Sequence, residues 1–291
     1  MRRLAMKERG FQFIVLFSAL CSIVFLFGII FSIFTEGYPI FERAGLFSFL
    51  FGQSWHPTHE PPDFGILPLI VGSIMVTVGA LIVSIPLGVG SAIYISELAK
   101  PKEKELLKPF IELLAGIPSV IYGLFGMAFL APFVRKLFNI PTGLNTFTTS
   151  IILGIMVVPI ISSLSEDAIS SVPKELREAS FALGANKWET IIKVVLPAAK
   201  SGIIASIILG FGRSIGETMV VLMVAGGSAI IPKSIFQPVR PMTSAIASEM
   251  GETIMGSEHY HALFGIAIVL FVITFVSNLI TEWERMKIRR R

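Results

Sequence analysis

The chain has 291 residues, of which 53% are hydrophobic and only 15% are charged, and its mean hydropathy is +0.77. A soluble domain carries about 25% charged residues, so a soluble fold of this length is excluded and the excess apolar surface is expected to face lipid. The net charge of +4 is too modest to indicate a nucleic-acid partner, and the single cysteine, Cys21, can form neither an internal disulfide nor a metal-ligand set.

Six apolar runs are long enough, or nearly so, to cross a bilayer as helices, which takes about 20 residues. In chain order they are Phe11–Phe34, Ile66–Ser96, Phe110–Phe133, Phe147–Leu164, Gly202–Val224 and His261–Ile280. Prolines inside several of them are compatible with membrane helices, because neighbouring helices can satisfy the freed backbone groups. The sequence therefore predicts an all-α polytopic membrane protein of about six transmembrane helices, one domain over residues 1–291 with its core at 66–285.

The first run follows basic residues, as the apolar core of a secretory signal peptide does. It is longer than the roughly 7–15 residues of such a core, however, and no small-x-small cleavage site follows it. We therefore interpret Phe11–Phe34 as a retained first span.

The distribution of positive charge predicts the orientation. Most of the 24 Lys and Arg residues lie in alternate segments, namely the two ends of the chain and the connections that contain Lys100–Lys108 and Lys174–Lys200. Cytoplasmic loops of membrane proteins carry an excess of Lys and Arg. Both termini are therefore predicted to be cytoplasmic, with an even number of spans.

Two connecting segments differ from simple loops. The inside segment 165–197 has mixed charge and predicts two short helices separated at Gly184, the second of which reaches Pro197 at the membrane edge. Such a helical knob could dock a soluble partner, or it could be an ordinary connection. The outside loop 226–258 contains several prolines, followed by a helix-like stretch Met242–Met255.

Arg213 is the one basic residue inside a predicted span, where a charge costs at least about 2.5–3.5 kcal/mol. Glu217 follows four residues later, on the same helix face. The glycines Gly210, Gly212 and Gly216 remove side-chain bulk, so that a helix or a ligand can approach closely, and Thr218 completes the segment. Two interpretations stay open, a neutralised structural pair and an anion site in a translocation path.

A guanidinium suits a tetrahedral oxyanion because its planar fork donates two parallel hydrogen bonds. A carboxylate beside it would repel a fully deprotonated anion but could accept a hydrogen bond from a protonated one. We therefore hypothesise that Glu217 favours phosphate, which keeps a proton near neutral pH, over sulfate, which does not.

The remaining candidates are weaker. Ser73, Thr77 and Ser84 share one face of the second span, where interhelical hydrogen bonding is a simpler explanation than a path. Arg240 could attract anions from outside or merely be solvated. Trp188 is expected to pack within the knob. His259 and His261 lie at the outside membrane edge, two residues apart, a spacing that does not favour a metal site on a helix. His56 and His59 lie in the first outside loop, where they are expected to be solvated.

No Gly-Lys dipeptide occurs in the sequence, so the phosphate-cradling P-loop is absent, and no Gly-x-Ser-x-Gly nucleophile motif occurs either. The chain is therefore not expected to be an enzyme or to hydrolyse ATP itself.

The inside segment resembles the EAA loop of ABC importer permeases. The family pattern is Glu-Ala-Ala, three residues, Gly, nine residues, Ile, one residue, Leu-Pro. The chain matches it at Glu178, Ala179, Gly184, Leu196 and Pro197, with Ser180 in place of the third Ala and Val194 in place of Ile. The resemblance implies a loop that inserts into a groove of the ATPase subunit and transmits its movement.

Four further segments resemble the PstC branch of the phosphate permease family. They are Leu114–Gly123, Gly212–Met219, Gln237–Arg240 and Glu258–Phe264, and the likeness covers nearly the whole chain, with a departure at Pro241-Met242-Thr243. It implies the type I importer permease fold in a bacterial or archaeal inner membrane, and a role in transport for Arg213 and Glu217. It also implies a homologous permease resembling PstA, ATPase subunits resembling PstB that hold ATP and Mg²⁺, and an external phosphate-binding protein resembling PstS. No cofactor on this chain and no nucleic acid are implied.

Three other functions remain possible on the sequence. A permease for molybdate, sulfate or phosphonate is the nearest. A secondary transporter or channel would need no docking loop for an ATPase. An intramembrane enzyme would need a catalytic dyad or a metal set within the spans, which Arg213 and Glu217 do not form.

Overall fold

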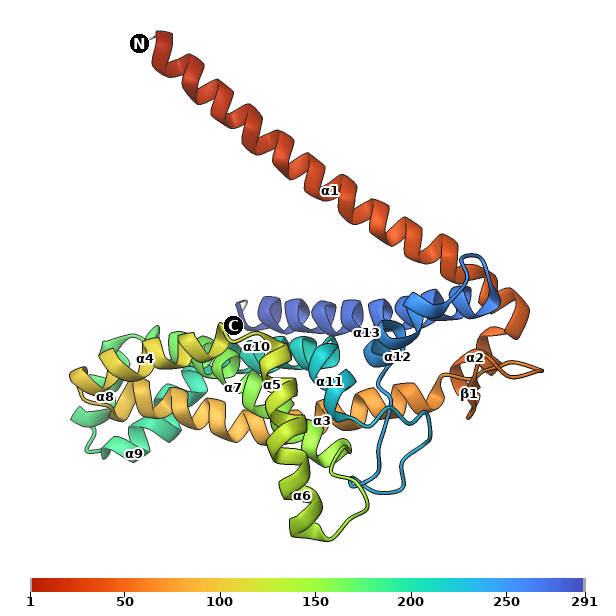
Figure 1. Ribbon diagram of the computed structural model, residues 1–291. Helices are drawn as coiled ribbons and strands as arrows, with labels where there is room; N and C mark the ends of the chain where they lie inside the picture. The colour runs from red at the N-terminus through yellow and green to blue at the C-terminus, as the bar shows by residue number, and fades with distance from the viewer. Residues whose placement is uncertain (1, 290–291) are drawn as a thin grey trace.

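The structure is a computed structural model that describes the backbone of residues 2–289 and the side chains of residues 11–280 and of Trp283. It is almost entirely helical, which confirms the predicted fold class (Figure 1). In chain order the elements are α1 (Arg2–Ala44), α2 (Leu46–Phe51), β1 (Trp55–His56), β2 (Asp63–Phe64), α3 (Leu67–Ile93), the π-helical turn η1 (Tyr94–Leu98), α4 (Pro101–Ala115), α5 (Ser119–Phe125), the π-helical turn η2 (Gly126–Leu130), α6 (Ala131–Phe138), α7 (Thr146–Ser170), α8 (Lys174–Ala182), α9 (Lys187–Thr190), the π-helical turn η3 (Ile191–Val195), α10 (Leu196–Ile215), α11 (Met219–Val224), α12 (Met242–Glu249), the 3₁₀ turn η4 (Met250–Glu252) and α13 (Glu258–Arg289).

Six helical stretches within the described residues are long and apolar enough to cross a membrane, as predicted. They are Phe11–Ala44, Leu67–Leu98, Ser119–Phe138, Thr146–Ser170, Lys187–Ile215 and Glu258–Ile280. The basic side chains at the two ends of the chain, which contribute to the predicted orientation, lie outside the described side chains. They are Arg2, Arg3, Lys7, Arg9, Arg285, Lys287, Arg289, Arg290 and Arg291.

The third and fifth spans differ from the predicted ranges. α4 ends at Ala115, and Pro118 precedes the first residue of α5, so the third span begins at Ser119 rather than Phe110. The fifth span was predicted as Gly202–Val224, but the helix begins at Lys187 and stops at Ile215. Pro197 does not end the preceding helix, because the wider π-helical turn η3 precedes it and lets the chain continue into α10.

The centre of the bundle is formed by α3 and α7, which pack closely along most of their length. Glycines at the contact allow the approach: an added Cβ at Gly88 would lie 2.8 Å from Ile161, and one at Gly154 would lie 2.8 Å from Val83. α10 also packs against α7, where an added Cβ at Gly210 would lie 3.0 Å from Ile161. The three helices therefore share one tightly packed apolar core.

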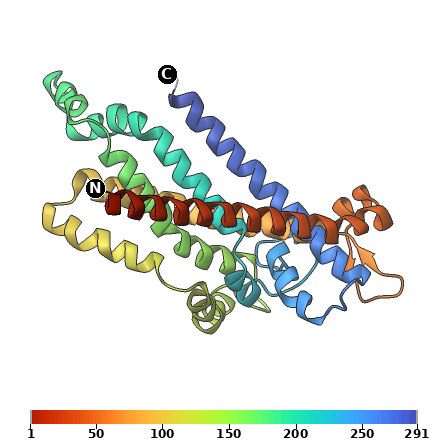
Figure 2. The same ribbon diagram turned by 90° about the horizontal axis from the view of Figure 1, so that it is seen from above.

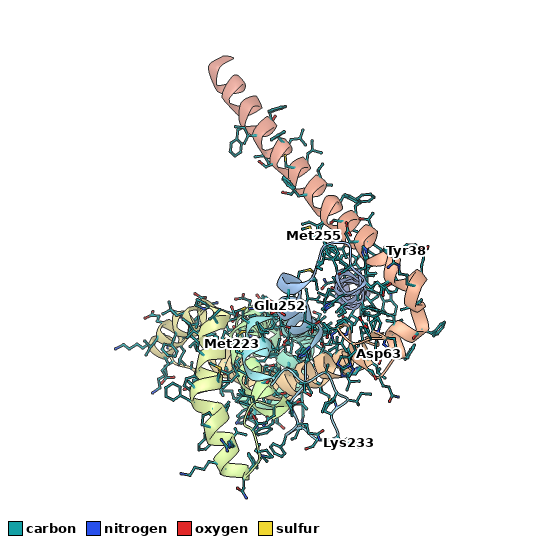
Figure 3. The ribbon with its side chains drawn as sticks, turned by 45° about the vertical axis from the view of Figure 1, so that its right-hand side comes forward. Tyr38, Asp63, Met223, Lys233, Glu252 and Met255 are labelled. Carbon is teal, nitrogen blue, oxygen red and sulfur yellow. The ribbon has the colours of Figure 1, made fainter. Side chains whose placement is uncertain are left out.

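The N-terminal helix stands apart from this core. The C-terminal part of α1 packs on α13, where Gly37 approaches the backbone of Phe264, whereas its N-terminal part projects away from the bundle (Figure 1). Seen from above, α1 passes over the bundle (Figure 2). Figure 3 labels Tyr38 on α1, Asp63 on β2, and Glu252 and Met255 after α12, and shows these segments gathered around α13 at one end of the molecule. By the predicted orientation, this end is the outer one.

The glycine packing between α3 and α7 gives a test of the fold. Gly88→Val should lower the melting temperature of the purified protein, because its side chain would collide with Ile161, an overpacking that costs about 1–3 kcal/mol. Gly90→Val is the matched control, since an added Cβ there meets nothing within 4 Å. Equal melting temperatures for the two variants would contradict the packing described.

Candidate functional site

Arg213 and Glu217 lie where a membrane helix is interrupted. α10 ends at Ile215, and after Gly216 and Glu217 the chain resumes as α11 from Met219. The break is close to the middle of the membrane domain, because Gly210, one turn before Arg213, packs against Val157 and Ile161 in the central turns of α7. The sequence placed the pair at this depth but predicted an unbroken helix.

Glu217 is buried, with only 3% of its side chain exposed, and both of its carboxylate oxygens are bonded. Oε2 accepts a hydrogen bond from Nη1 of Arg213, while Oε1 accepts from the backbone N–H groups of Met219, at 3.1 Å, and Val220, at 3.4 Å. These two N–H groups open α11 and have no partner within the helix. The carboxylate therefore caps α11 and neutralises Arg213 at the same time.

The backbone at the break is held by a second contact. The hydroxyl of Thr243, in the first turn of α12, donates a 2.7 Å hydrogen bond to the carbonyl of Glu217. Sequence reasoning missed Thr243, because its partner is 26 residues away and no local pattern signals the contact.

Arg213, unlike the buried Glu217, is partly exposed. Its side chain is 43% exposed, and Glu217 is its only hydrogen-bond or ion-pair partner within the described residues. The surface beside it is open, since an added Cβ at Gly212 would meet nothing within 4 Å and one at Gly216 only the carbonyl of Gly212, at 3.4 Å. Most of the N–H donors of the guanidinium are thus available for an anion.

The predicted path residues Arg213, Glu217, Gly212, Gly216 and Thr218 all lie at this break. The glycines, however, have two roles. Gly210 serves the contact between α10 and α7, whereas Gly212 and Gly216 border open surface. On the second span, Ser73 accepts a hydrogen bond from the backbone N–H of Met242, at 2.8 Å, so it joins α3 to α12 and does not line a path.

The end of the bundle that carries β1 and β2 holds a cluster of polar contacts around Glu249. Its carboxylate pairs with Arg240 at 2.6 Å and His259 at 2.8 Å, and accepts from the indole N–H of Trp55 at 3.2 Å. The sequence offered two interpretations of Arg240, a solvated residue or one that attracts anions. Neither describes it, because its guanidinium is paired with Glu249. His261 bonds the carbonyl of Glu36, at 2.7 Å, and no group of three or more His, Cys, Asp or Glu side chains suited to a metal occurs in the described part of the chain.

The segment that carries the Glu-Ala-Ser motif forms a compact knob of α8 and α9. Gly184 adopts a φ of +84°, a conformation that glycine accepts most readily, and turns the chain between the two helices. Ser180 bonds Thr190 across the turn at 2.9 Å, and both are buried, which explains the hydroxyl in place of the family's third Ala. The knob lies within the predicted 165–197, but α7 runs on to Ser170, and Leu196 and Pro197 belong to the continuous fifth helix.

The surface of the knob carries exposed apolar side chains among its charged ones. Leu176, Ala179 and Leu183 line a groove of about 500 Å³ on it, and Glu178 is exposed next to Ala179 in the sequence. Trp188 was expected to pack within the knob, but 58% of its surface is exposed. The side chains that would form a core in an isolated domain therefore face outward here.

A buried carboxylate that sequence reasoning missed joins α4 to the C-terminal half of α7. Glu166 pairs with Lys104 at 2.9 Å and with Lys108 at 2.6 Å, and accepts from the hydroxyl of Ser170 at 2.8 Å. The hydrogen bond to Glu166 raises the pKa of Lys108 above its ordinary value. Lysine is charged below that pKa, so Lys108 keeps its charge in this contact throughout the physiological pH range and loses it at strongly alkaline pH.

Comparison with known proteins identifies the relatives of this chain. Residues 84–290 match the family model described as "Binding-protein-dependent transport system inner membrane component". The chain is 40% identical to the probable ABC transporter permease protein YqgH of Bacillus subtilis, over 81% of this chain and 76% of that protein. It is 33% identical to the phosphate transport system permease protein PstC of Mesorhizobium japonicum, over 100% of this chain and 93% of that protein.

Among solved structures, the chain is similar to one from a bacterial alginate ABC transporter in complex with a periplasmic protein. The TM-score is 0.67 and the match covers 97% of each chain, at 14% sequence identity. This likeness shows that the helices have the arrangement of a type I ABC importer permease.

The double role of Glu217 can be tested by comparing two substitutions. Glu217→Ala removes the cap of α11 and should destabilise the protein by about 1–2 kcal/mol more than Glu217→Gln, whose amide oxygen can still accept from Met219 and Val220. Melting temperatures in detergent measure the difference. If the alanine variant were as stable as the glutamine variant, the carboxylate would not be a cap.

Proposed function

The chain belongs to the family of inner membrane components of binding-protein-dependent transport systems, and on this basis we propose that it is the permease subunit through which an ABC importer moves inorganic phosphate into the cell. As a member of that family it is a multi-pass inner membrane subunit without catalytic activity or cofactor of its own. ATP is hydrolysed on a partner chain of the transporter. The proposal concerns the substrate, the residues that meet it and the particular partners.

The observation that carries the substrate class is the accessible guanidinium of Arg213 at the break between α10 and α11. Glu217 holds it in place, and the open surface at Gly212 and Gly216 leaves room for a tetrahedral oxyanion beside it. An arginine fork donates paired hydrogen bonds to such an anion. The choice of phosphate is supported by relatives named as phosphate permeases, 33–34% identical over most of the chain.

The structure refines what Glu217 can do for selectivity. Oε1 already accepts two backbone hydrogen bonds, so a protonated anion could bond only to Oε2, which it would share with Arg213. We therefore propose that the main role of Glu217 is to orient the guanidinium of Arg213. A hydrogen bond from a singly protonated phosphate to Oε2 stays a hypothesis about selectivity.

The second candidate is a type I permease for another oxyanion, such as molybdate, sulfate or phosphonate. It is favoured by the same guanidinium, which would suit any of these anions, and the name of the Bacillus subtilis relative specifies no substrate. Competition between oxyanions in an uptake assay separates the two candidates.

The proposed partners are a second permease resembling PstA, ATPase subunits resembling PstB and an external phosphate-binding protein resembling PstS. We propose that the knob faces the cytoplasm, with both termini, and that the ATPase covers its exposed apolar side chains and Glu178. Large apolar side chains that are exposed together mark an interaction surface. The Glu249 cluster lies at the opposite end, where the binding protein would dock.

The substrate proposal predicts that Arg213→Lys reduces phosphate uptake by the assembled transporter at least about tenfold. A lysine keeps the charge but presents a single ammonium group instead of a planar fork. Uptake of radiolabelled phosphate, with sulfate and molybdate as competitors, measures the effect, and Arg135→Lys on exposed α6 is the control. Normal uptake rates in Arg213→Lys would refute binding of the anion by the planar guanidinium. Competition by sulfate or molybdate equal to that by unlabelled phosphate would favour the second candidate.

The docking proposal predicts opposite results for two substitutions of Gly184. Gly184→Val places a β-branched residue at a φ of +84°, which costs about 1–2 kcal/mol and distorts the knob, so co-purification of the ATPase should fall sharply. Gly184→Asn should retain most of it, because asparagine tolerates this conformation. Undiminished ATPase binding by the valine variant would count against docking at the knob.

A further inference from the structure

Arg177 occupies an unusual place on the knob. It lies on α8, directly before Glu178, yet its side chain is only 17% exposed and turns back toward the membrane helices. Its partner Glu97 is 11% exposed and belongs to η1, the π-helical end of the second span. The two residues are 80 positions apart in the sequence, so no helical spacing could have predicted the pair.

The guanidinium of Arg177 contacts three elements at once. Nη2 and Nε donate to the same oxygen of Glu97, at 2.7 Å and 3.3 Å. Nη2 also donates to the carbonyl of Ile169, at 3.0 Å, and Nη1 to that of Val172. Ile169 lies in the last turn of α7, and Val172 lies two residues after its end, in the connection to α8. One side chain thus joins α8 to η1 and to the end of α7.

This connection differs from the other ion pair on the knob. Lys193 and Glu189 are four residues apart on one helix, 3.6 Å from each other and largely exposed, so they join nothing distant and contribute little. The pair of Arg177 and Glu97 is shielded from water, and loss of either partner would leave a buried charge uncompensated.

We propose that Arg177 and Glu97 form the joint that passes a displacement of α8 to α3 and α7. The proposal rests on the proposed function, in which an ATPase moves the knob. α3 and α7 are packed together through glycine contacts, and α7 holds α10 at Gly210, one turn from Arg213. A rigid joint at Arg177 therefore completes a continuous packed connection from the docking surface to the candidate anion site. Arg177 and Glu97 act as positioning residues and do not touch the substrate.

The first test measures the rigidity of the joint in the assembled transporter. Spin labels are placed at the exposed positions Glu175 on α8 and Leu87 on α3, in a background in which the single cysteine is changed by Cys21→Ser. The label-to-label distance distribution should be narrow, and it should broaden at least about twofold in Arg177→Gln and in Glu97→Gln. The double variant should be no broader than either single one, because both remove the same interaction.

Lys174→Gln is the matched control for this measurement. Lys174 is exposed on the same helix and forms no ion pair within the described residues, so its distribution should stay narrow. Arg177→Lys should be intermediate, since an ammonium group keeps the charge but lacks the fork that reaches Glu97 and the carbonyls together. Equal widths in all variants would overturn the proposal.

The second test separates coupling from stability. In proteoliposomes, the phosphate imported per ATP hydrolysed should fall roughly tenfold in Arg177→Gln, a typical size for a coupling effect, while ATP hydrolysis continues. If uptake and hydrolysis instead fell together with the amount of assembled complex, Arg177 would be only structural and the joint would be refuted. Failure of the unsubstituted transporter to import phosphate would refute the proposed substrate alone, because the distance measurement involves no substrate.

Discussion

The arrangement of the site depends on one buried carboxylate. A helix that stops at mid-depth leaves backbone N–H and C=O groups without partners in a medium where water cannot supply them, and a guanidinium at that depth is itself costly. Glu217 answers both requirements, because one oxygen caps α11 and the other pairs with Arg213. The helix break and the charge of Arg213 thus stabilise each other. The two interpretations left open by the sequence, a structural pair and an anion site, are compatible, because Arg213 pairs with Glu217 while the rest of its guanidinium stays exposed.

The rest of the fold supports this break from two directions. α7 holds α10 through the glycine contact at Gly210, and α12 holds the backbone of Glu217 through Thr243. Beyond these contacts, shielded carboxylates fasten the two ends of the bundle, Glu249 at the end that carries β1 and Glu166 at the end that carries α4. Close packing between glycine-bearing helices resists continuous deformation, so movement at one end is passed along the bundle as a displacement of whole helices.

What the sequence could predict follows from the range of each interaction. The number of spans, the turn at Gly184 and the contact between Arg213 and Glu217 depend on residues close in the chain, and the structure confirms these three predictions, although the bounds of the third and fifth spans were wrong. The break after Ile215 was not predictable from Gly216, because glycine also occurs inside membrane helices. The stabilising contact comes from Thr243, which is 26 residues away from Glu217 in the sequence. The early start of the fifth helix was missed because Pro197 is compatible both with a helix end and with a π-helical turn before it.

Long-range ion pairs lie beyond sequence reasoning for the same reason, and Arg240 shows the consequence. As a lone basic residue in a loop it offered only solvation or attraction of anions, whereas the fold supplies Glu249 as a partner. Trp188 shows the converse error, since an aromatic residue in a small helical unit is expected to pack inward, and here it faces a surface that another chain would cover.

The exposure of Arg213 bears on how this chain assembles with other subunits. A guanidinium 43% exposed at mid-depth could not face lipid, because a charged group in hydrocarbon needs water, an anion or a polar partner. The surface beside it is widened by Gly212 and Gly216, so this chain supplies only one wall of the space in front of the arginine. Under the proposed function, the opposite wall comes from another polypeptide that keeps lipid out and admits water, as expected of a pore formed between two permease subunits. The open side of the site would then be the side on which this chain meets the second permease.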